Sequence, residues 1–140
     1  MRKTIFVLIL YCCGLSTAFS ESGDWVLFSE DTNARWYTLK GEGDLNNDFA
    51  MVWFLADLKR PMTLTNGVRY QSFKTLEGFN CGAYTSHRVK FIAFAGPFGG
   101  GGQVPSSEES SRTQSEEFAP DDWKARGYEN FCKKRWQFWK

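Results

Sequence analysis

The chain offers few side chains that could carry out catalysis. Its one histidine, His87, could act as a general base beside Ser86 or Asp57, but the sequence contains no G-x-S-x-G elbow and no recognisable third member. The neighbours Ser86 and Arg88 indicate instead a sheet position with an exposed imidazole. We therefore predict a non-enzymatic protein with no catalytic residue and no cofactor.

The residues that could bind a metal ion or a phosphate also fall short of the patterns that this chemistry needs. Asp44, Asn46 and Asp48 match the start of a calcium-binding loop, but Phe49 replaces the required glycine and Leu55 replaces the bidentate glutamate. A single histidine excludes a multi-histidine metal centre within one chain. We expect no metal site and a plain polar loop over residues 41–48.

The glycine-rich run at residues 96–102 is the one segment that could be imagined to cradle a phosphate group. No Lys-Ser/Thr pair follows it, and no helix is expected to open after it, as a phosphate-binding loop requires. We predict a flexible hairpin connection there.

The first twenty residues read as a secretory signal peptide. Arg2 and Lys3 precede an apolar run over residues 5–15, and the small residues Ala18 and Ser20 stand at −3 and −1 of a cleavage site. A membrane anchor is the alternative, but the run is shorter than the roughly 20 apolar residues needed to span a bilayer. Lipidation of Cys12 or Cys13 is a further alternative, although that processing prefers a small residue before the cysteine.

Removal of residues 1–20 leaves two cysteines, Cys81 and Cys132. An exported domain with two cysteines in an oxidising compartment commonly forms one disulfide bond. Two free buried thiols are the alternative, and a zinc site with His87 fits less well because the spacing is wrong for metal ligands.

Length and charge limit the class of protein. A chain of 140 residues fits one domain, and the net charge of +1 does not favour a polybasic nucleic-acid binder. We expect a domain over residues 21–134 and a basic aromatic tail over residues 135–140. Residues 21–132 contain 11 basic and 16 acidic residues, a net charge of −5, so an acidic body precedes this tail.

Hydrophobic patterning predicts five strands and one helix. The strand segments are residues 25–29, 35–39, 49–55, 70–79 and 88–95, separated by short connections with turn residues at 31–33 and 65–68. Lys59-Arg60-Pro61 is expected to end the third strand, a short strand could follow around Gln103-Val104, and residues 106–117 read as a mobile loop.

A helix is expected to start at Pro120-Asp121-Asp122, with Ala125, Tyr128, Cys132 and Trp136 at helical spacing. Gly127 weakens this helix prediction. The fold class is α+β: a single, mostly antiparallel sheet of five to six strands with a C-terminal helix pinned to it by a disulfide.

The basic aromatic segment at the C-terminus is the most unusual part of the sequence. Cations that flank tryptophans suit an anionic membrane interface, whereas the alternative is a helix end whose rings pack on the sheet. Four cations are too few to favour nucleic-acid binding. The candidate surface-binding residues are Lys133, Lys134, Arg135, Trp136, Trp139 and Lys140.

Several landmarks in their order along the chain resemble the bacterial surface-adhesin protein E family over residues 23–134. They are Gly23-Asp24-Trp25-Val26-Leu27, Val52-Trp53, Gly67-Val68-Arg69-Tyr70-Gln71-Ser72, Phe79-Asn80-Cys81, Arg88, the glycine-rich turn and Cys132. The acidic stretch at residues 106–117 and the aromatic tail depart from that family.

The resemblance implies a six-stranded antiparallel sheet with a C-terminal helix, and it places Cys81 and Cys132 in the disulfide positions. It also implies binding of host extracellular-matrix or serum proteins, and a homodimer. We expect an exported binding protein of the bacterial periplasm or cell surface. The alternative is a periplasmic envelope or membrane-surface protein with a structural or stress role that uses the C-terminal tail.

Overall fold

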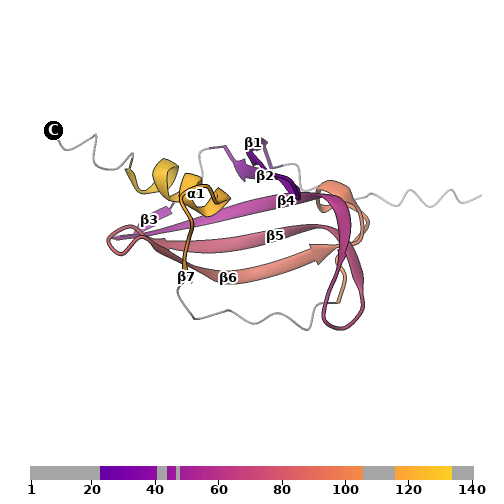
Figure 1. Ribbon diagram of the computed structural model, residues 1–140. Coiled ribbons are helices and arrows are strands. Elements are labelled where there is room, and N and C mark those ends of the chain that lie inside the picture. The colour runs from indigo at the N-terminus through magenta and orange to yellow at the C-terminus, as the bar shows by residue number, and fades with distance from the viewer. Residues whose placement is uncertain (1–22, 41–43, 47, 106–115, 134–140) are drawn as a thin grey trace, which may run out of the picture.

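The computed structural model describes residues 23–40, 44–46, 48–105 and 116–133, which form one antiparallel sheet with a helix against one face (Figure 1). The strands lie in the order β1-β2-β4-β5-β6-β7, and β3 pairs with β4 beside β2. The predicted α+β fold is confirmed. The strands are β1 (Trp25–Glu30), β2 (Ala34–Leu39), β3 (Asp44–Asn46), β4 (Phe49–Thr63), β5 (Arg69–Asn80), β6 (Thr85–Phe94) and β7 (Glu116–Glu117), and the helices are η1 (Pro97–Gly99) and α1 (Trp123–Phe131).

A tight turn joins β1 to β2 as the sequence predicts. The Asp31 carboxylate accepts hydrogen bonds from the backbone N–H groups of Asn33 (2.7 Å) and Ala34 (2.8 Å) and from Trp36 Nε1 (2.8 Å). An aspartate side chain that bonds the backbone two or three residues on stabilises a turn, so this hairpin is encoded locally.

The central strand β4 is longer than predicted. It pairs with β2 and β3 on one edge and with β5 on the other. Its residues on the α1 side are buried, whereas Met51 and Trp53 on the opposite side are half-buried and Phe49 is exposed. The strand does not end at Lys59 but continues to Thr63. Its pairing with β5 is interrupted between Asp57 and Met62, and Pro61 lies within this interruption, where the missing N–H is tolerated.

Two predicted loops contain short strands. Asp44–Asn46 forms β3 within the predicted loop at 41–48, and Glu116–Glu117 forms β7 at the end of the predicted loop at 106–117. Residues 41–43, 47 and 106–115 lie outside the described residues. The strand expected near Gln103 is reduced to one bridge with Phe94.

The helix α1 starts where predicted, because Asp122 caps it and accepts a hydrogen bond from the Lys124 N–H (3.3 Å). Of the predicted stripe, Ala125 and Cys132 are buried and Tyr128 is half-buried. The helix ends at Phe131, and Trp136 lies outside the described residues.

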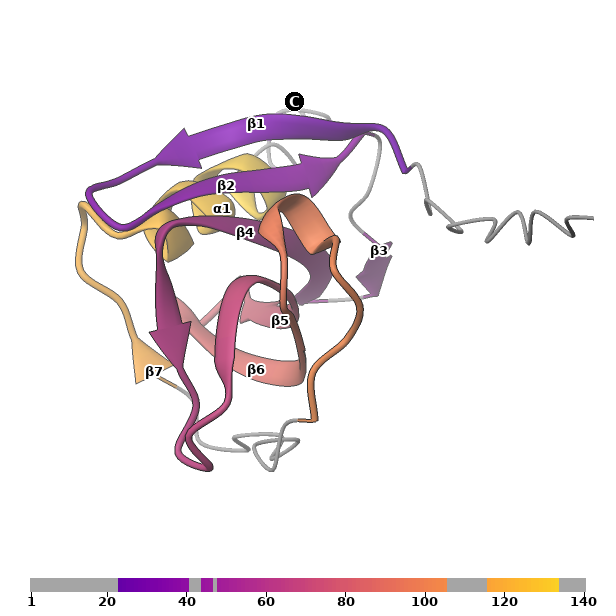
Figure 2. The ribbon, with the colours of Figure 1, turned by 90° about the vertical axis from the view of Figure 1, so that its right-hand side faces the viewer.

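Aromatic rings fill the space between the sheet and α1. Phe54 of β4 lies at the centre, with ring centroids 5.5 Å from Phe28, 4.9 Å from Trp123 and 6.1 Å from both Phe131 and Phe79. The sheet twists so strongly that the β1–β2 hairpin lies on the same side of β4–β6 as α1 (Figures 1 and 2). The curled sheet therefore encloses the helix on its concave side.

The Cys81–Cys132 disulfide joins the end of β5 to the end of α1, with a Cα–Cα distance of 5.3 Å. The Tyr128 hydroxyl adds a hydrogen bond to the Cys81 carbonyl (2.6 Å). The predicted disulfide is confirmed, and the alternatives of free thiols and a zinc site are wrong.

Candidate binding surface

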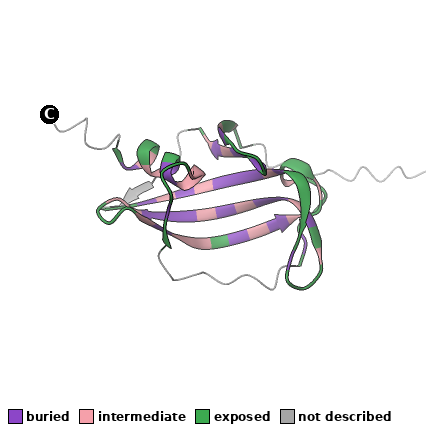
Figure 3. Cartoon of the chain, in the orientation of Figure 1, coloured by how far each residue is buried: buried purple, intermediate pink, exposed green. Residues whose placement is uncertain are grey.

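The face of the sheet that points away from α1 carries an unusual mixture of apolar and cationic side chains. Because side chains alternate along a strand, every second residue of β4, β5 and β6 reaches this side. Figure 3 shows this alternation as buried and half-buried bands along the three strands. We call the following set the open face: Phe49, Met51, Trp53, Lys74, Leu76, His87, Lys90 and Ile92.

Cross-strand pairing brings the open face together from segments far apart in the sequence. Trp53 lies opposite Leu76, which in turn lies opposite Lys90 on β6. Phe49 is 44% exposed, and the other apolar members are half-buried. Apart from η1 at one end, no described helix or strand packs on this side of β4–β6, so the open face is accessible over the part of the chain that the structure describes.

Lys74 occupies an aromatic setting at the edge of the open face. Its Nζ atom lies 5.6 Å from the centre of the Trp25 ring and 5.5 Å from the centre of the Phe94 ring. These rings come from β1 and β6, on either side of the β5 lysine. Both distances are within the range of a cation–π interaction, which holds the ammonium group in place.

The glycine-rich run, which was predicted to be a flexible connection, covers one end of this side of the sheet, where Gly99 lies beside Lys74 and Leu55. The Ser72 hydroxyl donates to the Gly96 carbonyl (2.6 Å) and accepts from the Gly99 N–H (2.8 Å). Asp57 accepts a hydrogen bond from the Phe98 N–H (2.9 Å). Gly99 has a φ of 74°, a conformation that glycine adopts without strain. The run is thus a packed boundary of the open face.

The candidate catalytic group does not assemble. His87 lies opposite Gly78 on the open face, whereas the preceding residue, Ser86, points to the α1 side and is buried. The Asp57 carboxylate is engaged by η1. The imidazole, predicted to be exposed, is half-buried because it packs over Gly78. Among the described residues, no three His, Cys, Asp or Glu side chains lie close enough to hold a metal ion.

A polar cluster lies on the opposite, buried side of the sheet and was not predicted from the sequence. Glu77 is fully buried, accepts a hydrogen bond from the Thr75 hydroxyl (2.8 Å) and lies 3.5 Å from Arg88 Nε. Glu77 Oε2 and the buried Ser86 hydroxyl have no protein partner in the described part of the chain. Alternation along β5 puts Glu77 on the same face as Phe73 and Phe79. This pattern is the feature of the sequence from which the burial of Glu77 could have been predicted.

Of the predicted tail residues, the structure describes only Lys133. It is exposed, and its Nζ atom lies 2.8 Å from Glu129 Oε1 in an ion pair. The hydrogen bond to this carboxylate raises the pKa of Lys133. Lys134, Arg135, Trp136, Trp139 and Lys140 lie outside the described residues. No helix within the described ranges is long and apolar enough to cross a membrane.

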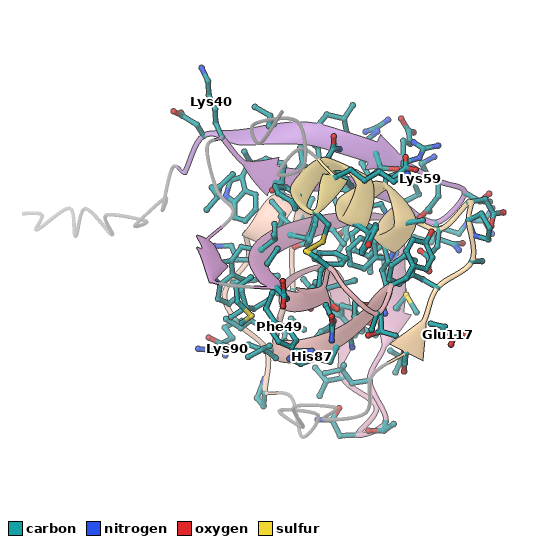
Figure 4. All side chains as sticks on the ribbon, turned by 90° about the vertical axis from the view of Figure 1, so that its left-hand side faces the viewer. Lys40, Phe49, Lys59, His87, Lys90 and Glu117 are labelled. Carbon is teal, nitrogen blue, oxygen red and sulfur yellow. A yellow bond between two sulfur atoms is a disulfide. The ribbon has the colours of Figure 1, made fainter. Side chains whose placement is uncertain are left out.

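Figure 4 shows that Lys90 lies apart from Lys40 and Lys59. His87, Lys90 and Phe49 lie along the sheet on the side away from α1, whereas Lys40 and Lys59 lie at the level of the β1–β2 hairpin. Lys59 forms an ion pair with Glu30 (2.8 Å), and this hydrogen bond lowers the pKa of the Glu30 carboxyl. Lys59 therefore stabilises the β1–β2 hairpin and is not part of the open face.

Solved structures of Haemophilus influenzae protein E have a similar fold. The structure of Haemophilus influenzae protein E is 14% identical, with a TM-score of 0.59 over 81% of this chain and 86% of that chain. Its crystal form II gives 14% identity and a TM-score of 0.61 over 81% and 89% of the two chains. Protein E from non-typeable Haemophilus influenzae gives 13% identity and a TM-score of 0.60 over 83% and 79%. At this identity the likeness establishes the fold.

Sequence comparison goes further than the structural likeness. No curated protein matches the chain. The family described as surface-adhesin protein E, however, matches residues 25–133, which include every strand and helix described above. Because this match covers most of the chain, the chain belongs to the surface-adhesin protein E family.

Proposed function

We propose that the protein is an exported, non-enzymatic binding protein whose open face holds a protein ligand, such as a host extracellular-matrix or serum protein. The observation that carries the proposal is the accessible apolar and aromatic character of this face. Apolar patches on a soluble domain commonly mark interaction sites. Membership of the family of surface adhesins supports a cell-surface location.

The arrangement of reactive side chains supports binding over catalysis. His87 and Ser86 point to opposite sides of the sheet, and the Glu77 carboxylate is sealed beneath the aromatic layer with no exposure. A general base must come within hydrogen-bond reach of the proton that it removes. These described groups converge on no common reacting position.

The proposal is tested with the oxidised protein and immobilised vitronectin and laminin in a surface-binding assay. We expect saturable binding to at least one of them and none to serum albumin. Phe49→Ser should weaken that binding about tenfold, because Phe49 is an exposed ring of the open face.

Met62→Ser is the matched control, since Met62 is 49% exposed but lies at the far end of β4. It should leave binding unchanged. A flat response to both ligands, or equal losses in the two variants, would contradict the proposal.

A second candidate function is a membrane-surface role for residues 133–140. The exposed position of Lys133 directly after the disulfide-bonded Cys132 supports it, as does the alternation of cations and tryptophans. Deletion of residues 133–140 should abolish sedimentation with anionic phosphatidylglycerol vesicles. Unchanged sedimentation would eliminate this candidate.

A further inference from the structure

The two outer edges of the described sheet differ in how they are protected. β6 pairs with β7 at one end and bridges to Gln103 at the other, and it carries the exposed Lys90 between them. β1 is the outermost strand on the other side (Figure 2), and no described strand pairs along its outer edge. Edge strands commonly carry lysine or proline, which prevent pairing with another chain, and residues 25–30 contain neither. The edge of β1 is therefore open to pairing.

The backbone of β1 offers hydrogen-bonding groups along this edge. The Asp24 carbonyl accepts a hydrogen bond from the Lys40 N–H (3.0 Å), so Asp24 and, two residues on, Val26 direct their backbone groups at β2. Because this direction alternates along an antiparallel strand, the N–H and C=O groups of Leu27 point away from β2. The β-bulge of β1 comes after Leu27, before Ser29, and leaves this stretch regular.

The side chains beside these backbone groups are apolar and exposed. Leu27 is 57% exposed and faces away from α1, together with its partner Tyr37 on β2. Val26 is 42% exposed and lies on the α1 side, where it pairs with the buried Thr38. When an extended segment adds to a sheet edge, backbone hydrogen bonds supply affinity and alternate side chains supply specificity. This edge therefore favours a segment with apolar side chains on both faces.

The charge at this edge distinguishes a foreign segment from a second copy of this chain. Asp24 is exposed and has no ion-pair partner among the described residues, although Lys40 lies opposite it on β2. If two copies of β1 paired antiparallel about Leu27, Asp24 of one copy would face the Glu30 region of the other. Like charges directly opposite each other destabilise a strand pair, whereas a cation opposite Asp24 stabilises it.

We propose that the outer edge of β1 receives an extended segment of another protein as an additional antiparallel strand. In that segment, the residue opposite Leu27 and the next one, opposite Val26, are apolar. The residue three positions after the first lies opposite Asp24 and is lysine or arginine. This surface is distinct from the open face, so the inference goes beyond the proposed function.

The test uses the oxidised protein and the synthetic peptide Thr-Thr-Val-Val-Thr-Lys-Thr in an NMR titration. We expect the peptide to bind and to protect the Leu27 amide, which points outward, from hydrogen exchange. N-methylation of the first valine removes the N–H that bonds the Leu27 carbonyl and should weaken binding about tenfold. N-methylation of the second valine, whose N–H points away from β1, is the matched control and should leave binding unchanged.

Substitutions in the protein then assign the contact. Asp24→Lys should weaken binding of this peptide about threefold and strengthen binding of the peptide with glutamate in place of lysine by a similar factor. Leu27→Lys introduces a protecting lysine at the edge and should abolish binding. Exchange of the Val26 amide, which points at β2, shows whether the hairpin stays intact in that variant. Phe49→Ser, on the open face, should leave peptide binding unchanged.

Three results would overturn the inference: absence of peptide binding, equal effects of the two N-methyl groups, or an unchanged charge preference in Asp24→Lys. Protection of the Leu27 amide that rises with protein concentration alone would also overturn it, because a second copy of the chain would then occupy the edge. Failure of vitronectin and laminin to bind would contradict the proposed function and leave peptide binding at β1 standing.

Discussion

The Asp31 carboxylate shows how one side chain fixes the start of the fold. Burial opposes its ionisation, but the hydrogen bonds from the Trp36 indole and from the Ala34 and Asn33 backbone outweigh that penalty and lower the pKa of Asp31 below its ordinary 3.8. A lowered folded-state pKa stabilises the folded protein above the unfolded-state value. This stability is lost as the pH falls through the folded-state pKa.

Asp31→Asn should therefore destabilise the protein at neutral pH by about 1 kcal/mol, because the amide replaces an acceptor of three hydrogen bonds. The difference from the wild type should shrink well below pH 3.8, where the wild-type carboxyl is protonated too. Urea unfolding at both pH values measures it, with the exposed Asp24→Asn as a control. A pH-independent difference would show that ionisation of Asp31 is not involved.

The buried pair of Glu77 and Arg88 makes a second prediction at this scale. Arg88→Met leaves the fully buried carboxylate without its cation and should lower the free energy of unfolding by about 2–3 kcal/mol, less than a fully buried pair because Arg88 is 31% exposed. The double variant Glu77→Met/Arg88→Met should recover much of that loss. Equal stability of the single and double variants in urea unfolding would refute this account.

Among the elements, α1 depends on a glycine that local propensity disfavours. A Cβ atom at Gly127 would lie 2.7 Å from Phe79 Cζ and 3.4 Å from Phe54 Cζ. The missing side chain lets the helix backbone approach the aromatic layer, and this explains why the helix tolerates a residue that costs about 1 kcal/mol relative to alanine.

Gly127→Ala should thus destabilise the protein by about 1–3 kcal/mol despite its better helix propensity. Asn130→Ala, at an exposed position of the same helix, should be neutral or stabilising. Thermal unfolding followed by circular dichroism compares the two. A stabilised Gly127→Ala variant would mean that Phe79 can move aside.

Turns, helix caps and strands that depend on residues close together in the sequence could be predicted from the sequence. The Asp31 turn, the Asp122 cap and the alternation of β5 are each written within a few residues, and each is confirmed. The end of β4 was predicted wrongly, because Pro61 is accommodated by an interrupted pairing with β5 that no local pattern reveals.

The open face could not be predicted in the same way. Lys74 gains its aromatic neighbours from Trp25 and Phe94, which only the folded sheet brings near it. The covering of Asp57 and Ser72 by the glycine-rich run likewise depends on tertiary packing. Because these contacts arise only in the folded protein, the sequence indicated the cationic tail as the candidate binding segment. Binding by the tail stays a prediction.

For the whole molecule, the disulfide is the covalent link between the sheet and the helix. It joins residues 51 apart, so its removal frees a long loop in the unfolded chain. Cys81→Ser/Cys132→Ser should lower the free energy of unfolding by about 3–4 kcal/mol. Urea unfolding under non-reducing conditions measures the change, and a loss below 1 kcal/mol would show that the aromatic layer alone holds α1.

The aromatic layer unites the two ends of the described chain, since Phe28 stacks on Phe131 at 6.2 Å and Arg126 bonds Ser29 at a separation of 97 residues. A ribosome delivers the first member of each pair long before the second. The concave side therefore stays unfilled until the segment that forms α1 has been made. A nascent chain that stops short of Trp123 lacks both the ring that stacks on Trp36 and the partner of Phe28, so the β1–β2 hairpin cannot complete its packing before that point.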